Sequence, residues 1–314
     1  MPHSGGMCAL AAAALVTVGG LAAQNLEVLQ VRPNFYMIAG AGGNVAFQVG
    51  LDGVVVVDSG SASSADAVVA AIKKVTAQPI RYVIDTSADA DHAGGNAAVA
   101  KAGQTLFTQT GGAGLAADFQ GGGASILSVE EVLTRMSGKP SPYPTGAWPT
   151  ETFHQPRKYM YLNGEGIEIL HQPAAHTDGD AIVFFRRSDV VVAGDILDTT
   201  RFPVIDIAKG GGIQGEIAAL QKLVDTAIPS VPIVSRDEGT LIVPGHGRIC
   251  DQLDVVEYRD MVTIIRDRIR DLKKQGLALE QVKAASPARG YTRRYGSDTN
   301  DFVEAVYRSL GKVQ

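Results

Sequence analysis

Short apolar runs, separated by Gly, Pro and Asp turns, dominate the chain from residue 27 onward. Their length and their content of β-branched residues predict β-strands. The first four predicted strands are residues 27–31, 35–38, 44–49 and 53–57. The last two form a hairpin in the segment VGLDGVVVVDSG, and the second of them is apolar on both faces. A strand of this kind belongs in the middle of a sheet, where both of its faces are covered.

Helical and strand-like patterns then alternate along the chain. Apolar residues recur with helical spacing in residues 63–76, where Val68, Ile72 and Val75 share one face. The predicted helices are 63–76, 95–102 and 125–136, and the predicted strands are 80–84, 105–108, 167–171, 181–185 and 190–193. This alternation is typical of an α/β domain in which helices cover the faces of a sheet.

The remaining parts of the chain differ from this pattern. Residues 138–156 contain five prolines and Trp148, the only tryptophan, and predict a long surface loop. Such a loop is either a wall of a binding site or a stiff connector, and the residues leave both open. The C-terminal part is predicted to be helical over 251–275, 279–285 and 301–310. Since no polar linker separates these helices from the rest, we expect one domain over residues 24–314, with the C-terminal helices from about 251 included.

The N-terminus has the composition of a targeting segment. Residues 7–23 form an uncharged run that ends in small side chains, as the apolar region of a signal peptide does. We therefore expect residues 1–23 to be a signal peptide, the mature protein to be periplasmic or secreted, and no stable membrane insertion after the leader is removed. A buried Ala-rich helix or an uncleaved anchor are the alternatives.

Charge and cysteine content narrow the possible ligands. The formal net charge is −5, so the chain lacks the basic surface that binds nucleic acid. We therefore expect a small-molecule substrate and no nucleic-acid partner, while the oligomeric state has no indicator in the sequence. Cys8 and Cys250 allow at most one bridge, and a disulfide framework is excluded.

Histidines and aspartates cluster in Gly-bearing turns that follow apolar strands. The first such turn, IDTSADADHAGGN, contains Asp89, Asp91 and His92. Three others are AHTDGD with His176, AGDI with Asp195 and VPGHG with His246. Functional sites of α/β folds lie at the ends of strands. We therefore expect these turns to meet in one site.

This order of motifs resembles the metallo-β-lactamase-fold superfamily, whose pattern is HxHxDH followed by His, Asp and His. The resemblance runs from about residue 27 to residue 250, and the C-terminal segments RRYG and FVEAVYRSL resemble the tail of exported hydrolase-like members. It implies an αββα four-layer sandwich with a metal site at one edge of the sheets. It also implies a C-terminal helical extension here.

The resemblance implies two sets of metal ligands. The second metal site of the family corresponds to Asp91, His92, His246 and the bridging Asp195. The first site keeps His176 and Asp195, but Ser87 and Asp89 stand where the family has its first two histidines.

Three states of the modified site are left open. The second site alone has the ligands for one Zn2+ or Fe2+. Alternatively, Asp89 completes a carboxylate-rich first site, as in flavodiiron-type members, and favours Mn2+ or iron. In the third state no metal is bound. We expect Zn2+, one or two ions, with iron or manganese as alternatives, and we expect Ser87 and Asp180 to support the ligands without binding the ion.

A bound divalent ion would activate water and polarise a carbonyl or phosphoryl oxygen. The sequence therefore predicts a metal-dependent hydrolase of an ester, amide, lactam, thioester or phosphoester, with Asp91 as catalytic residue. The alternatives are a non-haem iron redox enzyme of the same fold and a non-catalytic binding protein with a degenerate site, because one fold hosts many functions.

Overall fold

Two β-sheets form the centre of the computed structural model, which describes residues 26–106, 122–230 and 239–311. The first sheet has seven strands in the order β1-β2-β3-β4-β5-β6-β7, and the second has five in the order β12-β11-β10-β9-β8. The strands of the first sheet are β1 (Glu27–Arg32), β2 (Phe35–Ala41), β3 (Gly43–Gly50), β4 (Gly53–Val57), β5 (Ile80–Ile84), β6 (Ser125–Val129) and β7 (Glu151–Phe153). Those of the second are β8 (Arg157–Leu162), β9 (Glu165–Gln172), β10 (Asp180–Phe185), β11 (Val190–Asp198) and β12 (Leu241–His246).

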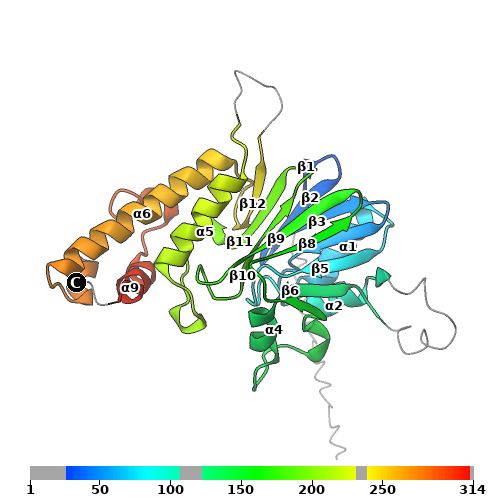
Figure 1. Cartoon of the computed structure of the whole chain (residues 1–314), viewed down its shortest axis with the longest axis horizontal. Helices are drawn as coiled ribbons and strands as arrows, with labels where there is room; N and C mark the ends of the chain where they lie inside the picture. The colour runs from blue at the N-terminus through cyan, green and yellow to red at the C-terminus, as the bar shows by residue number, and fades with distance from the viewer. Residues whose placement is uncertain (1–25, 107–121, 231–238, 312–314) are drawn as a thin grey trace, which may run out of the picture.

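Helices cover the outer faces of both sheets (Figure 1). The helices of the described ranges are α1 (Ala65–Val75), α2 (Asn96–Lys101), α4 (Glu130–Ser137), α5 (Ile213–Thr226), α6 (Gln252–Lys274), α7 (Leu279–Ala284), α8 (Thr292–Tyr295) and α9 (Asn300–Ser309), of which α1 and α2 cover the first sheet and α5, α6 and α9 the second. Two short 3-10 helices are η2 (Thr145–Ala147) and η3 (Ile207–Lys209). Within the described ranges, none of the helices has both the length and the apolar character that crossing a membrane requires.

Strand β4 shows how the apolar pattern produces the layers. Val54 and Val56 pack against α1 and α2, whereas Val55 and Val57 point to the other face and pack between the two sheets. All five residues of β4 are buried, and the strand lies in the middle of its sheet as the sequence predicts. The third apolar layer lies between the second sheet and the helices α5, α6 and α9. The result is an αββα sandwich with additional C-terminal helices, and this prediction is confirmed.

Most predicted elements are found with small changes at their ends, but residues 125–136 are not one helix. Residues 125–129 form β6, which pairs in parallel with β5, and only then does α4 begin. Apolar spacing alone did not separate a buried strand from the helix that follows it directly. Of the predicted strand 105–108, residues 105 and 106 are not in a strand, and 107–108 lie outside the described residues, as does the predicted signal peptide.

The predicted Pro-rich loop contains two short elements. Strand β7 pairs in parallel with β6 at the edge of the first sheet, and η2 precedes it. A strand of three residues fits at this edge because Pro149 and Pro156 flank it and proline cannot continue a ladder. The long C-terminal helix α6 is confirmed, and Asp251 caps it by accepting a hydrogen bond from the Asp254 N–H.

The two sheets are joined close to the ends of β3 and β12. The Asn44 side-chain amide donates to the Pro244 carbonyl oxygen at 2.9 Å and to that of Gly247 at 3.0 Å. Asn44 itself is buried. This contact ties the first sheet to the segment that holds His246.

Candidate metal centre

Strand ends bring the predicted site residues together. Asp89, Asp91 and His92 lie in the turn that follows β5, Asp195 is within β11, and His246 is the last residue of β12. His176 comes from the turn between β9 and β10. They form two groups, each with its ligand atoms within 4.8 Å of one another: Asp91, His92 and His246 in one group, and Asp89, His176 and Asp195 in the other. We call Asp91, His92 and His246 the open group, and Asp89, His176 and Asp195 the closed group.

Asp195 also reaches the open group. Its Oδ1 atom lies 3.1 Å from His92 Nε2 and 3.4 Å from His246 Nε2. Asp91 Oδ2 lies 3.2 Å from the same His246 nitrogen. The two imidazole rings are almost perpendicular, at 87°, so that both Nε2 atoms face Asp195. Asp195 therefore lies between the two groups and contacts residues of both.

His92 is held in one orientation by Asp58, a residue that the sequence analysis missed. His92 Nδ1 donates to Asp58 Oδ2 at 2.8 Å, which leaves Nε2 as the atom directed to the site. Asp58 in turn accepts hydrogen bonds from the backbone N–H and the hydroxyl of Thr86, at 2.8 and 2.7 Å. Gly43 permits this arrangement, because a Cβ atom there would lie 2.7 Å from His92 Cε1. Such a carboxylate partner fixes the tautomer of a ligating histidine.

Three atoms of the open group and its bridging residue are buried and make no hydrogen bond of suitable geometry among the described residues, although Asp195 Oδ1 lies only 3.1 and 3.4 Å from the two imidazole nitrogens. They are His92 Nε2, His246 Nε2 and Asp195 Oδ1. Buried polar atoms are normally paired, so three that converge on one point require an explanation. Two imidazole nitrogens together with carboxylate oxygens are a ligand set that suits Zn2+ or Fe2+. The open group with Asp195 therefore fits a divalent ion.

The pKa shifts of Asp195 and His246 agree with a site for a positive ion. Burial acts to raise the pKa of Asp195, but the neighbouring His92 holds it well below its usual range. The carboxylates of Asp195 and Asp91, which lie close to Nε2, raise the pKa of His246 to about 9. A metal ion at this site would therefore have to compete with a proton for the same nitrogen.

In the closed group, His176 and Asp89 are bonded to each other and to neighbouring residues. His176 Nε2 lies 2.7 Å from Asp89 Oδ2, and His176 Nδ1 lies 2.7 Å from the Val204 carbonyl oxygen. The second oxygen of Asp89 accepts a hydrogen bond from Lys209 Nζ at 2.9 Å. Burial lowers the pKa of His176, but Asp89 outweighs this effect and raises it to about 10. Neither oxygen of Asp89 is unpartnered, in contrast to the open group.

The two predicted supporting residues make different contacts from those expected. Ser87 is buried, and its Oγ accepts the backbone N–H of Asp89 at 3.3 Å instead of contacting the Asp89 carboxylate. Asp180 accepts from the backbone N–H and the hydroxyl of Thr177, at 2.7 and 2.8 Å. It therefore shapes the turn that carries His176 without touching the ring. Burial raises the pKa of Asp180 to about 7.

The Pro-rich segment reaches the site through Tyr143. Its hydroxyl donates to the Ala88 carbonyl oxygen, next to Asp89. Burial and the charge of Asp89 raise the pKa of Tyr143 to about 12, so the hydroxyl keeps its proton. Trp148 Nε1 in turn donates to the Tyr143 carbonyl oxygen at 3.3 Å. This segment thus packs directly on the turn that carries the candidate ligands.

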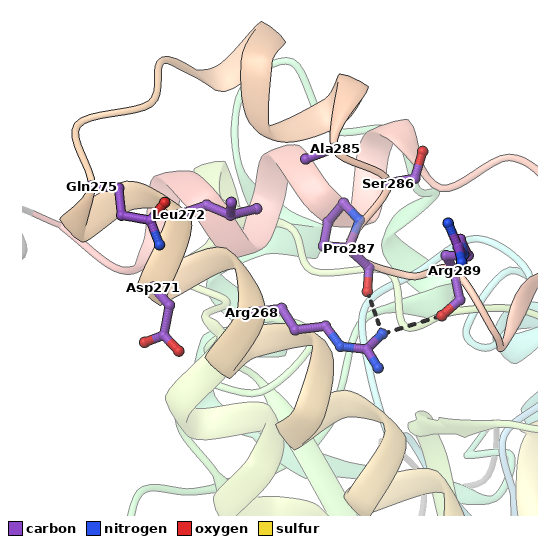
Figure 2. A pocket seen from close by; sticks show the side chains of 8 residues that line it. All are labelled: Arg268, Asp271, Leu272, Gln275, Ala285, Ser286, Pro287 and Arg289. Carbon is purple, nitrogen blue, oxygen red and sulfur yellow. Dashed lines mark hydrogen bonds between the residues drawn. The ribbon is translucent and has the colours of Figure 1, made fainter.

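A pocket elsewhere in the molecule contains none of these residues. It lies between α6 and the segment after α7 (Figure 2). Arg268 in this pocket donates to the carbonyl oxygens of Pro287 and Arg289, at 2.8 and 3.1 Å. The guanidinium therefore ties the C-terminal helices to α6.

Comparison with known proteins agrees with this geometry. The family model described as the metallo-beta-lactamase superfamily matches residues 39–106, a range that includes Asp58, Asp89, Asp91 and His92. Comparison with curated proteins finds no match.

Solved structures resemble the chain at low sequence identity. The stereoselective inverting sec-alkylsulfatase Pisa1 from Pseudomonas sp. aligns with a TM-score of 0.67 and 15% identity, over 92% of this chain and 51% of that one. The chain thus spans about half the length of the sulfatase. A metallo-beta-lactamase from Pontibacter korlensis aligns with a TM-score of 0.56 and 16% identity, over 76% of this chain and 99% of that one. DIM-1 metallo-beta-lactamase aligns with a TM-score of 0.55 and 14% identity, over 76% and 97%.

Fold, motif order and family model point to the same conclusion. The sheets and helices form the expected sandwich, and the strand-end turns bring the motif residues into one place. The chain has the metallo-β-lactamase fold, and its residues 39–106 match the model of the metallo-beta-lactamase superfamily.

Proposed function

We propose that the chain is a metal-dependent hydrolase of a small molecule, with a divalent ion held by Asp91, His92, His246 and Asp195. The observation that carries the proposal is the convergence of the unpartnered His92 Nε2, His246 Nε2 and Asp195 Oδ1. We propose Zn2+ as the resident ion, because mixed imidazole and carboxylate ligands suit it, with iron or manganese as the alternatives.

The protein's own residues are arranged for hydrolysis. When bound, a divalent ion brings the pKa of a water molecule toward about 7 and polarises a carbonyl or phosphoryl oxygen. Asp58 keeps the His92 ring in one orientation. The Asp91 side chain is 40% exposed and presents its carboxylate to the open side of the group. The nearby His246, whose Nε2 lies 3.2 Å from Asp91 Oδ2, lowers the pKa of Asp91, so that its carboxylate is ionised and can accept a proton from the attacking water.

The bond to be cleaved belongs to an ester, amide, lactam, thioester or phosphoester. Structural similarity to a sec-alkylsulfatase and to metallo-beta-lactamases supports hydrolysis as the reaction and adds alkyl sulfates to the classes to be tested. We also propose that residues 1–23 are removed on export and that residues 24–314 act in the periplasm or medium. N-terminal sequencing of protein from a periplasmic fraction tests this, and a sequence that still begins at Met1 contradicts it.

The central experiment combines metal content with activity. The full chain is purified without chelator, its metals are measured by mass spectrometry, and hydrolysis is followed on a panel of the substrate classes above. Zinc together with hydrolysis that is lost in Asp91→Asn is the expected result. Asp225→Asn is the matched control, because Asp225 is an exposed residue of α5 whose carboxylate accepts from Gln221, away from the site. Protein that takes up no divalent ion, or iron with oxygen-dependent turnover, contradicts the proposal.

A further inference from the structure

Lys209 places a positive charge beside the closed group. It is the last residue of η3, and its Nζ lies 2.9 Å from Asp89 Oδ1 and 3.1 Å from Asp206 Oδ2. The opposite oxygen of Asp89 contacts His176. Lys209 and His176 therefore hold the Asp89 carboxylate from its two sides.

The position of Lys209 is fixed by the backbone around it. Asp206 accepts the Lys209 backbone N–H at its Oδ1 atom, and the Asp206 N–H donates to the His176 carbonyl oxygen at 2.9 Å. The Lys209 carbonyl oxygen accepts from the Asp178 N–H at 2.9 Å and from Arg135 at 3.2 Å. The segment that carries Lys209 is thus attached to the turn that carries His176, and the lysine is part of the site.

The closed group lacks what a second metal ion needs. Its only imidazole is His176, Ser87 Oγ is used by the Asp89 backbone, and both Asp89 oxygens are paired. A divalent ion bound by Asp89 and His176 would also lie next to the Lys209 ammonium group, which is 2.9 Å from Asp89 Oδ1, and the two positive charges would repel each other. The ligand set and its electrostatics therefore do not fit a second ion.

We propose that Lys209 takes the place of a metal ion at the closed group, so that the chain binds one divalent ion at the open group and uses the lysine as its second cation. This inference rests on the proposed function, because it assumes that the open group binds metal. An ammonium group has three N–H donors. Asp89 and Asp206 are its two partners among the described residues, and the side chain is 38% exposed. The third donor is available for an oxygen of the substrate.

Metal stoichiometry tests the inference without the need for a substrate. Co2+ is titrated into metal-free protein while its visible absorption is recorded, and bound metal is counted by mass spectrometry. We expect one equivalent for the wild type and for Lys209→Arg, which keeps the charge. We also expect one equivalent for Ser87→His, in which Lys209 is still present, and two equivalents for the double variant Ser87→His with Lys209→Met. The double variant receives the missing imidazole and loses the ammonium group.

The outcomes separate this inference from the proposed function. Wild-type protein that binds two equivalents, or a double variant that saturates at one while its far-ultraviolet spectrum is native, overturns the role of Lys209. A second equivalent in Ser87→His alone also overturns it, because the lysine then does not exclude the ion. Wild-type protein that binds no metal contradicts the proposed function itself.

Discussion

The open and closed groups use the same residue types, share Asp195 at their border, and differ in what surrounds them. Each has at least one histidine and one aspartate with ligand atoms within 4.8 Å. In the open group and its bridging residue, the atoms that face the centre are buried and unpartnered. In the closed group, His176 and Lys209 bind the Asp89 carboxylate. The comparison teaches that residue types and spacing do not define a metal site until the neighbouring charges are known.

The largest effect is expected from exchanging one histidine in each group. Loss of an outer partner of a ligand costs about 10- to 100-fold in metal affinity, so His92→Gln, which removes a ligand, should cost at least about 100-fold. His176→Gln should leave the affinity nearly unchanged, because His176 contacts Asp89 and the Val204 carbonyl oxygen. Competition with a chromophoric chelator measures both variants. Equal losses in the two variants would show that the groups do not differ.

The second largest effect should be the pH dependence of metal affinity at the open group. The pKa of His246 is raised to about 9, so below that pH a metal ion has to displace a proton. Apparent affinity should therefore rise about tenfold per pH unit for each proton released, up to about pH 9.

Stability of the metal-free protein should show the opposite trend. The folded state holds the His246 proton more tightly than the unfolded state does. This contribution is complete below about pH 6.5 and is lost as the pH rises through about 9. Chelator competition and urea unfolding over this range measure the two trends. An affinity independent of pH would exclude His246 as a ligand.

The smallest effect concerns the glycine that follows Lys209. Gly210 has φ +85, and a Cβ atom there would lie 2.8 Å from Asp178 Cβ. Gly276 has φ +83 and nothing within 4 Å, so it is a matched control for the backbone term alone. The left-handed conformation costs a non-glycine residue about 1–2 kcal/mol. Gly210→Ala should therefore lower the free energy of unfolding, and by more than Gly276→Ala does, because the new Cβ atom also meets Asp178. Urea unfolding measures both variants. Equal losses of stability would mean that the segment around Lys209 can shift to make room for the added Cβ atom.

The fold was largely predictable because its strands are short apolar runs with clear turns. Strand β4 follows directly from four valines between Gly53 and Asp58. The error at 125–129 has a physical cause: this strand is recognised by its pairing with β5, which the local pattern does not contain. The candidate ligands were predicted from Gly-bearing motifs beside apolar runs, and the fold brings them close together, although Asp195 lies within β11 and His246 ends β12.

The electrostatic partners of the ligands were not predictable in the same way. Lys209 is 120 residues from Asp89, and their contact depends on how the 200–212 segment folds over the turn that carries His176. Asp58 had a weak indicator, a lone acidic residue after a fully apolar strand, but its link to His92 spans 34 residues. Whether the closed group can accept an ion is decided by such contacts.

The bond from Asn44 to the Pro244 and Gly247 carbonyl oxygens has a consequence for biosynthesis. It joins positions that are 200 and 203 residues apart, and the open group itself needs residues from 91 to 246. Contacts of such long range form late, because the closure of a long loop is entropically costly. A nascent chain therefore cannot assemble the open group until β12 has left the ribosome. On the proposed function, metal uptake would then report that both sheets have docked.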